Sequence, residues 1–176
     1  ANALQFNGSS TFVSCGNVAP IKDITSQITV EVRFNCSNVT ASYPMLVTKS
    51  GVSDNGFELR FGNGTSKLEF LVGGNNTTSP TSLSNNTNYF VSVTYDGAAK
   101  AIYIDGILNA SSSFTGTIPT NTNNLNIGNR DDGYYFSGVI QEVRIWNIAR
   151  TPEQIALYAN CKLTGQEEGL VYYADF

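Results

Sequence analysis

Three segments with strand-like patterns carry a glutamate and an arginine two positions apart, a spacing with two chemical interpretations. Because side chains alternate sides along a strand, each pair would project from one face. The pairs are Glu31–Arg33, Glu58–Arg60 and Glu142–Arg144. If the protein were a retaining glycosidase, Glu31 and Glu142 would act as its acid and its nucleophile. That chemistry requires the two carboxyl groups to lie about 5–5.5 Å apart, with one of them held neutral. An arginine on the same face favours ionisation instead. We therefore predict an outward-facing cross-strand ladder of charges and no enzymatic activity.

The composition excludes several other classes of function. The 176 residues include no histidine, which removes Ser–His and Cys–His catalysis and every histidine-ligated metal site. The 10 Lys and Arg against 14 Asp and Glu give a net charge of −4, which does not suit a nucleic-acid partner. No apolar run approaches the ~20 residues of a transmembrane helix. We expect neither nucleic-acid binding nor membrane insertion.

Aromatic and amide side chains in polar segments could bind a carbohydrate. Sugar rings pack on flat aromatic faces, and amides hydrogen bond to hydroxyl groups. The candidates are Tyr43, Asn129, Tyr134, Tyr135 and Phe136. In the alternative interpretation, some of these tyrosines cover the core and keep their hydroxyls in water. For Trp146 we favour a structural role, packed beneath a helix that begins at Thr151.

Alternation of polar and apolar residues predicts β-strands along most of the chain. The clearest segments are residues 28–34, 57–61, 67–72, 89–95, 100–104 and 142–146. Asn63-Gly64 and Asp105-Gly106 separate strand segments and tolerate the positive φ that tight hairpins require. Three polar segments, residues 50–56, 73–88 and 115–124, are predicted to be loops.

The C-terminal part of the chain contains a helix signal followed by a last strand. Thr151-Pro152-Glu153-Gln154 is typical of a capping box, and the helix is expected to end near Asn160. Residues 169–176 return to a strand pattern. Together these elements predict an all-β fold: a two-sheet antiparallel β-sandwich with one short helix near the C-terminus.

Several motifs occur in a recognisable order along almost the whole chain. They are ALQFNGSSTFVSCGN, ITVEVRF, NYFVSVTYDG with IYIDG, LNIGN, GVIQEVRIWN with TPEQI, and LTGQEEGLVYYADF. As a set they resemble the concanavalin A-like lectin/glucanase superfamily, in particular its laminin G-like and pentraxin-like jelly rolls. The resemblance implies a jelly roll of two sheets. Relatives often begin with the strand that closes this chain. We therefore expect residues 1–176 to be a single laminin G-like domain, a module of a larger secreted protein.

The resemblance to pentraxins also implies a calcium site. In that family an Asp-Asn pair and an acidic loop supply oxygen ligands to calcium, and the matching positions here are Asp54, Asn55, Asp131 and Asp132. Arg130 stands where the family has an acidic ligand, which opposes a divalent cation. In the alternative interpretation these residues form turns, in which Asp and Asn bond to their own backbone. Calcium is therefore a candidate cofactor, with both interpretations open.

The lectin-like jelly roll that the resemblance implies, together with the aromatic loops, the low charge and the absence of catalytic residues, indicates a function outside catalysis. We expect a non-catalytic, lectin-like module of a secreted or cell-surface protein that binds a glycan or polysaccharide beside other domains of its parent protein. The alternatives are a structural or adhesive module that binds protein partners and, less favoured, a glycoside hydrolase or lyase.

Cys15, Cys36 and Cys161 lack the spacing of a zinc or thioredoxin-type motif. One disulfide with a spare thiol, or three small buried side chains, remain alternatives.

Overall fold

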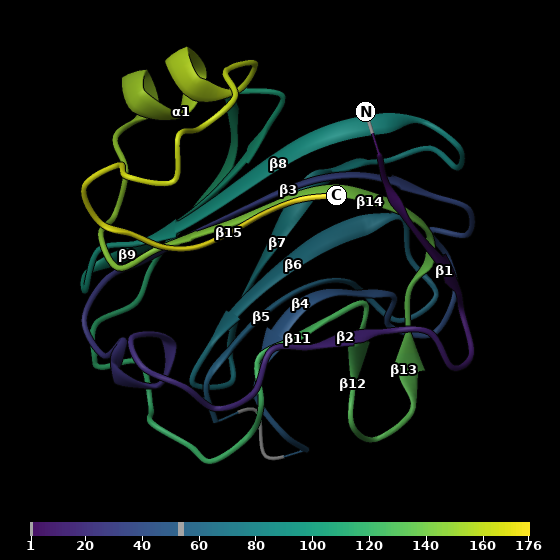
Figure 1. Cartoon of the computed structure of the whole chain (residues 1–176), viewed down its shortest axis with the longest axis horizontal. Helices are drawn as coiled ribbons and strands as arrows, with labels where there is room; N and C mark the ends of the chain where they lie inside the picture. The colour runs from purple at the N-terminus through teal and green to yellow at the C-terminus, as the bar shows by residue number, and fades with distance from the viewer. Residues whose placement is uncertain (1, 53–54) are drawn as a thin grey trace.

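The computed structural model describes residues 2–52 and 55–176, which form two antiparallel β-sheets packed face to face (Figure 1). Sheet A has the order β1-β14-β3-β8-β9-β10, and β15 also pairs with β14. Its strands are β1 (Leu4–Asn7), β3 (Ile28–Cys36), β8 (Asn88–Tyr95), β9 (Ala99–Ile104), β10 (Ile107–Ser113), β14 (Ser137–Trp146) and β15 (Leu170–Asp175). The predicted two-sheet sandwich is thus confirmed.

Sheet B has the order β2-β11-β4-β5-β6-β7. Strands β12 and β13 form a separate two-stranded hairpin that follows β11 along the chain. Its strands are β2 (Val13–Ser14), β4 (Met45–Lys49), β5 (Phe57–Phe61), β6 (Lys67–Val72), β7 (Asn75–Ser82) and β11 (Asn126–Ile127). The hairpin consists of β12 (Asn129–Arg130) and β13 (Tyr134–Tyr135), and a 3-10 helix, η1, covers Ile21–Asp23.

The core lies between the sheets and follows the alternation in the sequence. Val30, Leu59, Val93 and Val143 are fully buried, and Phe34 of sheet A meets Phe61 of sheet B edge to face with ring centroids 5.9 Å apart. Burial of such apolar side chains is the main contribution to folding. The strand faces predicted to point inward therefore do form one core.

The predicted tight turn between β9 and β10 is confirmed in its backbone geometry. Asp105 and Gly106 have φ of 50° and 81°, and both values are positive as a type I′ hairpin requires. Asp105 also accepts a hydrogen bond from the backbone N–H of Phe90 at 2.9 Å. Asn63-Gly64 likewise links β5 to β6, with φ of 65° at Gly64.

Helix α1 (Pro152–Tyr158) has the predicted capping box. The Thr151 hydroxyl accepts from the N–H of Gln154, whose side chain accepts from the N–H of Thr151 at 2.9 Å. On the sheet A face that α1 covers, Trp146 is buried, and the guanidinium of Arg150 lies 4.1 Å from its ring centroid. The structural role predicted for Trp146 is thus supported.

The glutamate–arginine pairs lie on the outer faces of the sheets, where all of their residues except the half-buried Arg33 are buried. On sheet A, Arg144 lies opposite Glu31 in the β3–β14 register and Glu142 lies opposite Arg33. Glu31 is 0% exposed and Arg144 is 1% exposed, because α1 and the segment after it cover this face. The outward-facing cross-strand ladder is therefore confirmed between β3 and β14, and the helix and the segment after it cover most of it. Glu58 and Arg60 belong to sheet B.

The segment predicted as a polar loop at residues 73–88 contains strand β7, so that prediction is wrong. β7 has the sequence NNTTSPTS and is an edge strand, so its backbone pairs with a neighbouring strand, β6, on one side only. The Oγ atoms of its Thr77 and of Ser112 on β10 hydrogen bond to each other across the two sheet edges. Polar contacts, not apolar ones, thus close this side of the sandwich, and for that reason the hydrophobic pattern does not reveal the strand.

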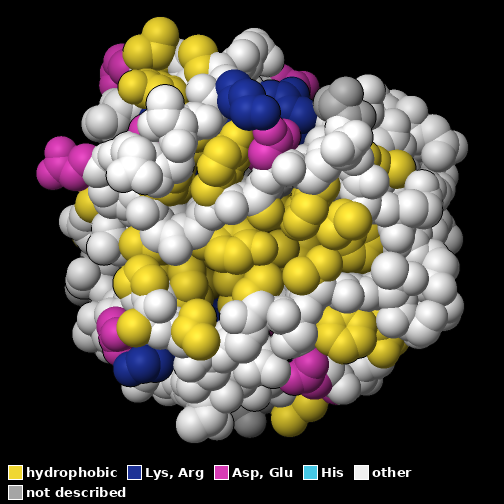
Figure 2. Space-filling view, viewed as in Figure 1, with side chains coloured by type: hydrophobic (Ala, Val, Ile, Leu, Met, Phe, Trp, Pro, Cys, Tyr) yellow, Lys and Arg dark blue, Asp and Glu magenta, His cyan; other side chains and the backbone are white. Residues whose placement is uncertain are grey.

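The opposite side of the sandwich is apolar at its surface. Figure 2 shows a broad band of hydrophobic side chains across the face where β15 and β2 form neighbouring edges. The Sγ of Cys15 and the hydroxyl of Tyr172 lie 3.3 Å apart and bridge these edges. Cys15, Cys36 and Cys161 are all free thiols, so no disulfide forms among them. Only Cys36 is buried, which corrects the alternative of three buried cysteines.

Candidate functional site

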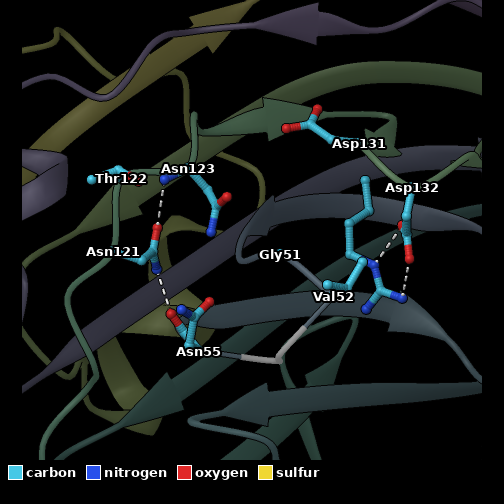
Figure 3. A pocket seen from close by; sticks show the side chains of 9 residues that line it. Gly51, Val52, Asn55, Asn121, Thr122, Asn123, Asp131 and Asp132 are labelled. Atoms are coloured by element: carbon cyan, nitrogen blue, oxygen red, sulfur yellow. Dashed lines mark hydrogen bonds and ion pairs between the residues drawn. The ribbon is translucent and has the colours of Figure 1, made fainter.

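A cavity of about 530 Å³ opens at the end of sheet B where β4 leads into β5. Three segments line it: Gly51, Val52 and Asn55 after β4, residues 121–123 before β11, and residues 130–132 of the β12–β13 hairpin. Figure 3 shows the amides of Asn55, Asn121 and Asn123 on one side, with Asp131 and Asp132 on the other. The cavity is thus lined mainly by groups that hydrogen bond.

The side chain of Asn121 joins two of these segments. Its Oδ1 accepts from the N–H of Asn123 at 3.0 Å, and its Nδ2 donates to the carbonyl of Lys49 at 3.1 Å and to the carbonyl of Asn55. A Cβ atom on Gly56 would lie 1.9 Å from the Lys49 carbonyl, so glycine is required for this approach. The cavity wall is therefore held in place before any ligand arrives.

Lys49 supports the same wall from behind. Its Nζ donates to the carbonyls of Asn121 and Asn123 at 3.3 and 2.8 Å and to Asn121 Oδ1 at 3.1 Å. The residue is 3% exposed, and burial lowers the pKa of its ammonium. Three protein oxygens thus take up the three donors of Lys49, which positions residues 121–123.

Arg130 lies between two carboxylates at the floor of the cavity. Its Nε and Nη2 donate to the two oxygens of Asp132 at 2.8 and 2.9 Å, and its Nη1 donates to Glu58 Oε1 at 3.0 Å. Burial alone would lower the pKa of Arg130, but the hydrogen bonds and attraction of Asp132 and Glu58 raise it overall. The guanidinium is therefore a fixed positive charge.

The ion pairs continue across the outer face of sheet B. Arg60 donates to Glu58 Oε2 at 2.7 Å and to Glu69 Oε2 at 3.0 Å, so Glu58 joins Arg60 to Arg130. Glu58 is 1% exposed. The Glu58–Arg60 pair is thus part of a charge network beside the cavity.

Two of the predicted aromatic residues meet over this network. The rings of Tyr43 and Tyr134 pack edge to face with centroids 5.1 Å apart. The guanidinium of Arg60 lies 4.5 Å from the Tyr43 ring centroid, and that of Arg130 lies 5.1 Å from the Tyr134 ring centroid. Both tyrosines are half-buried, so they offer a partly exposed aromatic surface next to the cavity.

The other three predicted ligand-binding residues lie elsewhere. Tyr135 is half-buried and packs with Phe12, at a centroid distance of 6.4 Å. Because it follows Tyr134 in a strand, its side chain points to the opposite face of the hairpin. Phe136 is 0% exposed and packs in the core against Phe34. Asn129 is 2% exposed. As corrections to the sequence-based assignment, Phe136 and Asn129 are buried structural residues.

The predicted calcium ligands are only partly brought together. Asn55, Asp131 and Asp132 line the cavity, whereas Asp54 lies outside the described residues. Asp131 Oδ1 accepts from Asn126 Nδ2 at 2.7 Å, and both oxygens of Asp132 are paired with Arg130. Within residues 2–52 and 55–176, no group of three or more His, Cys, Asp or Glu side chains is placed to hold a metal. The described part of the set does not fit a calcium site, and calcium stays a prediction that depends on Asp54.

The pair of glutamates considered as glycosidase residues is held by arginines. Arg150 Nη1 lies 3.1 Å from Glu31 Oε1, and Arg144 Nη2 lies 2.8 Å from Glu142 Oε1. Glu31 also accepts from the indole N–H of Trp146 at 3.1 Å. These contacts occupy both carboxylates, and Glu31 is also fully buried.

A depression on the outer face of sheet A is a second location to consider. It has a volume of about 740 Å³, and its lining includes Arg33, Glu142, Lys162 and Tyr173. Lys162 pairs with Asp175 at 2.7 Å. None of the residues predicted to bind a sugar lines either hollow, but three of the predicted metal ligands line the cavity of sheet B, and the Tyr43–Tyr134 pair lies beside it at Arg130.

Comparison with protein families gives a match over most of the chain. The family model described as the concanavalin A-like lectin/glucanases superfamily matches residues 7–156. The chain belongs to this superfamily. The predicted resemblance is therefore confirmed. A search of curated protein sequences gives no match.

Solved structures with the same fold include proteins of several kinds. A candidate carbohydrate-binding protein from Bacteroides ovatus has a TM-score of 0.77 and 24% identity over 99% of this chain, which spans 52% of that protein. A SAP-like pentraxin from Limulus polyphemus has a TM-score of 0.69 and 16% identity, covering 98% of this chain and 90% of that one.

A third structure is a CBM40 module of a Ruminococcus gnavus sialidase bound to α2,3-sialyllactose. It has a TM-score of 0.72 and 16% identity, covering 89% of this chain and 96% of the module. At these identities the likeness shows a shared fold. In the described part of the chain, no helix has the length and apolarity needed to span a bilayer.

Sequence reasoning missed Lys49, Asn121 and Asn123 as parts of the site. The signal in the sequence is the asparagine-rich stretch at residues 120–124, whose composition predicts a loop but no binding role. Which of its amides face the cavity depends on the approach of residues 55–56, and that approach is a property of the folded chain.

Proposed function

We propose that the chain is a carbohydrate-binding module, without catalytic activity of its own, of a secreted or cell-surface protein. The observation that carries this proposal is the fixed, amide-lined cavity beside the Tyr43–Tyr134 aromatic pair. Amides, carboxylates and hydroxyls around a cavity match the paired donors and acceptors of sugar hydroxyls. The aromatic surface beside it suits the C–H face of a sugar ring.

Two of the solved structures with the same fold support the same proposal. The Ruminococcus gnavus module was solved with a bound oligosaccharide, and the Bacteroides ovatus protein is described as a candidate carbohydrate-binding protein. The buried, arginine-bound Glu31 and Glu142 support a non-catalytic role. Incubation with polysaccharides while reducing ends are measured tests that role directly, since released ends would contradict it.

Glycan-array and affinity-gel binding of the whole chain tests the proposal. Tyr134→Ala removes the ring next to Arg130 and is expected to weaken binding roughly two- to tenfold, because an aromatic contact contributes about 0.5–1.5 kcal/mol beyond burial. Tyr135→Ala is the matched control, since the neighbouring tyrosine points to the other face of the hairpin. Absence of binding across soluble and insoluble polysaccharides would remove the proposal.

A structural or adhesive module that binds a protein partner is the second candidate. The observation that favours it is the hydrophobic band between β15 and β2 (Figure 2), because exposed apolar patches mark interaction surfaces. Light scattering of the purified chain separates the two candidates. A defined dimer disrupted by Tyr172→Ser, together with no glycan binding, would support this candidate over the first.

A further inference from the structure

We infer that the cavity of sheet B selects neutral, hydroxyl-rich sugars and excludes sugars that carry a carboxylate. The inference rests on the proposed function, because it names the class of glycan that the same cavity would bind. A protein binds a sugar carboxylate most strongly with a cation that is open to it. Around this cavity the described cations are bound to protein oxygens.

Arg130 is the cation in the cavity lining, and two carboxylates occupy its guanidinium. Asp132 binds it with two hydrogen bonds of 2.8 and 2.9 Å, and Glu58 binds it at 3.0 Å. A ligand carboxylate would have to displace one of them. Removing the partner of a buried carboxylate leaves an uncompensated charge. Glu58 is 1% exposed, so its exchange for an acidic sugar is unfavourable, whereas Asp132 is exposed and is held by its two hydrogen bonds to Arg130.

The two other cations near the cavity are occupied in the same way. Arg60 donates to Glu58 and Glu69. Lys49 donates to the main chain and side chain of Asn121 and to the carbonyl of Asn123, behind the cavity wall. Both residues are buried, so neither offers a donor to a molecule in the cavity.

The charges of the described residues around the cavity leave an excess of carboxylate. Glu58, Glu69 and Asp132 are paired with Arg60 and Arg130. Asp131 lines the cavity and has a neutral partner, Asn126, at 2.7 Å. A second carboxylate placed beside Asp131 would be repelled, because like charges within a few ångströms disfavour each other.

The polar groups that remain suit hydroxyls. Asn55 and Asn123 carry amides that both donate and accept, Thr122 carries a hydroxyl, and Asp131 accepts. A sugar hydroxyl also donates and accepts, so a neutral sugar can pair with each of these groups without adding charge. This selectivity would differ from that of the Ruminococcus gnavus module, which binds sialyllactose.

A glycan array of matched pairs tests the inference. Lactose is compared with α2,3-sialyllactose, and methyl-esterified pectin with its de-esterified form, alongside other neutral and acidic polysaccharides. We expect the bound glycans to be neutral, with any acidic partner bound at least tenfold more weakly. Binding that requires the carboxylate would overturn the inference and leave the proposed function intact. Absence of binding to every glycan would overturn the proposed function, and the inference with it.

A charge variant shows whether the selectivity comes from the cavity. Asp131→Asn keeps an oxygen for Asn126 and removes one negative charge, so binding of the acidic partners should increase on the order of tenfold. Glu168→Gln makes the same change in net charge at an exposed position outside the cavity. An equal increase in both variants would assign the effect to net charge and overturn the inference.

Discussion

The rings of Tyr43 and Tyr134 meet edge to face with centroids 5.1 Å apart, although the two residues come from distant parts of the chain. Tyr43 precedes β4 of sheet B, and Tyr134 begins β13 of the hairpin. The contact therefore places the hairpin against the outer face of sheet B, with Arg60 and Arg130 beneath the two rings. Arg130 also lines the cavity, so the aromatic pair lies next to it.

The Asn121 side chain is expected to stabilise both the fold and the site. Asn121→Ala removes its hydrogen bonds to the carbonyls of Lys49 and Asn55 and leaves the Lys49 ammonium with one acceptor fewer. We expect the free energy of unfolding to fall by about 2 kcal/mol and glycan affinity to fall with it. Urea denaturation measures the first and titration with a bound glycan the second. Asn124→Ala, at an exposed position nearby, is the control, and equal losses in both variants would contradict the role of Asn121.

The buried network on sheet A predicts a larger effect on stability. Glu31→Gln leaves Arg144 and Arg150 without their shared carboxylate. The buried arginine charges would then lack the carboxylate that offsets their desolvation. The free energy of unfolding should therefore fall by roughly 3–5 kcal/mol. Chemical denaturation checks this value, with the exposed Glu168→Gln as the reference. A loss below about 1 kcal/mol would show that the network contributes little.

The fold could be predicted from the sequence to a large extent because its longer strands have one apolar face. Strands β3, β5 and β8 follow their alternating patterns, and α1 follows its capping box. Strand β7 could not be found in this way, since its inward Thr77 and Ser79 are polar. Two-residue strands such as β11 and β12 are too short to show any period.

The site was less predictable, for a different physical reason. Tyr134, Asp131 and Asp132 could be selected by residue type, but burial decided against Phe136 and Asn129. Sequence alone does not distinguish a tyrosine on the cavity side of a hairpin from its neighbour on the other side. The burial of Glu31 and Arg144 likewise depends on where the chain places α1, so the polar pattern predicts an outward-facing ladder but not the helix that covers it.

Burial of Lys100 predicts a specific pH dependence. Burial lowers the pKa of its ammonium to about 8 from an ordinary value of 10.5, and its Nζ donates to Asn75 Oδ1 at 2.7 Å. Between pH 8 and 10.5 the unfolded chain therefore binds more protons at this residue than the folded chain, so this contribution raises stability as the pH increases. From pH 7 to 9.5 the gain should be about 1–2 kcal/mol.

Lys100→Met isolates this contribution from the other titrating groups. The variant lacks the ammonium, so the difference in unfolding free energy between the wild type and Lys100→Met should change by the same amount over that range. Parallel stability curves for the two proteins from pH 7 to 9.5 would show that the Lys100 ammonium is not desolvated in the folded state.

Calcium can be tested by thermal unfolding. Because Arg130 already neutralises Asp132 and Glu58, we expect millimolar calcium to leave the melting midpoint unchanged. A ligand that binds only the folded state raises the midpoint by mass action. A rise with calcium that EDTA reverses would contradict this expectation and establish the site predicted from the resemblance to pentraxins.

The location of the glycan site is the central claim, and an NMR titration of the labelled chain tests it most directly. A neutral oligosaccharide selected on the array is added, and the backbone amide shifts are followed. The largest changes are predicted at Asn55, Asn123 and Asp131, with smaller ones at Tyr134. Changes centred on Arg33 and Lys162, in the depression on sheet A, would contradict the account and move the site to the other face of the sandwich.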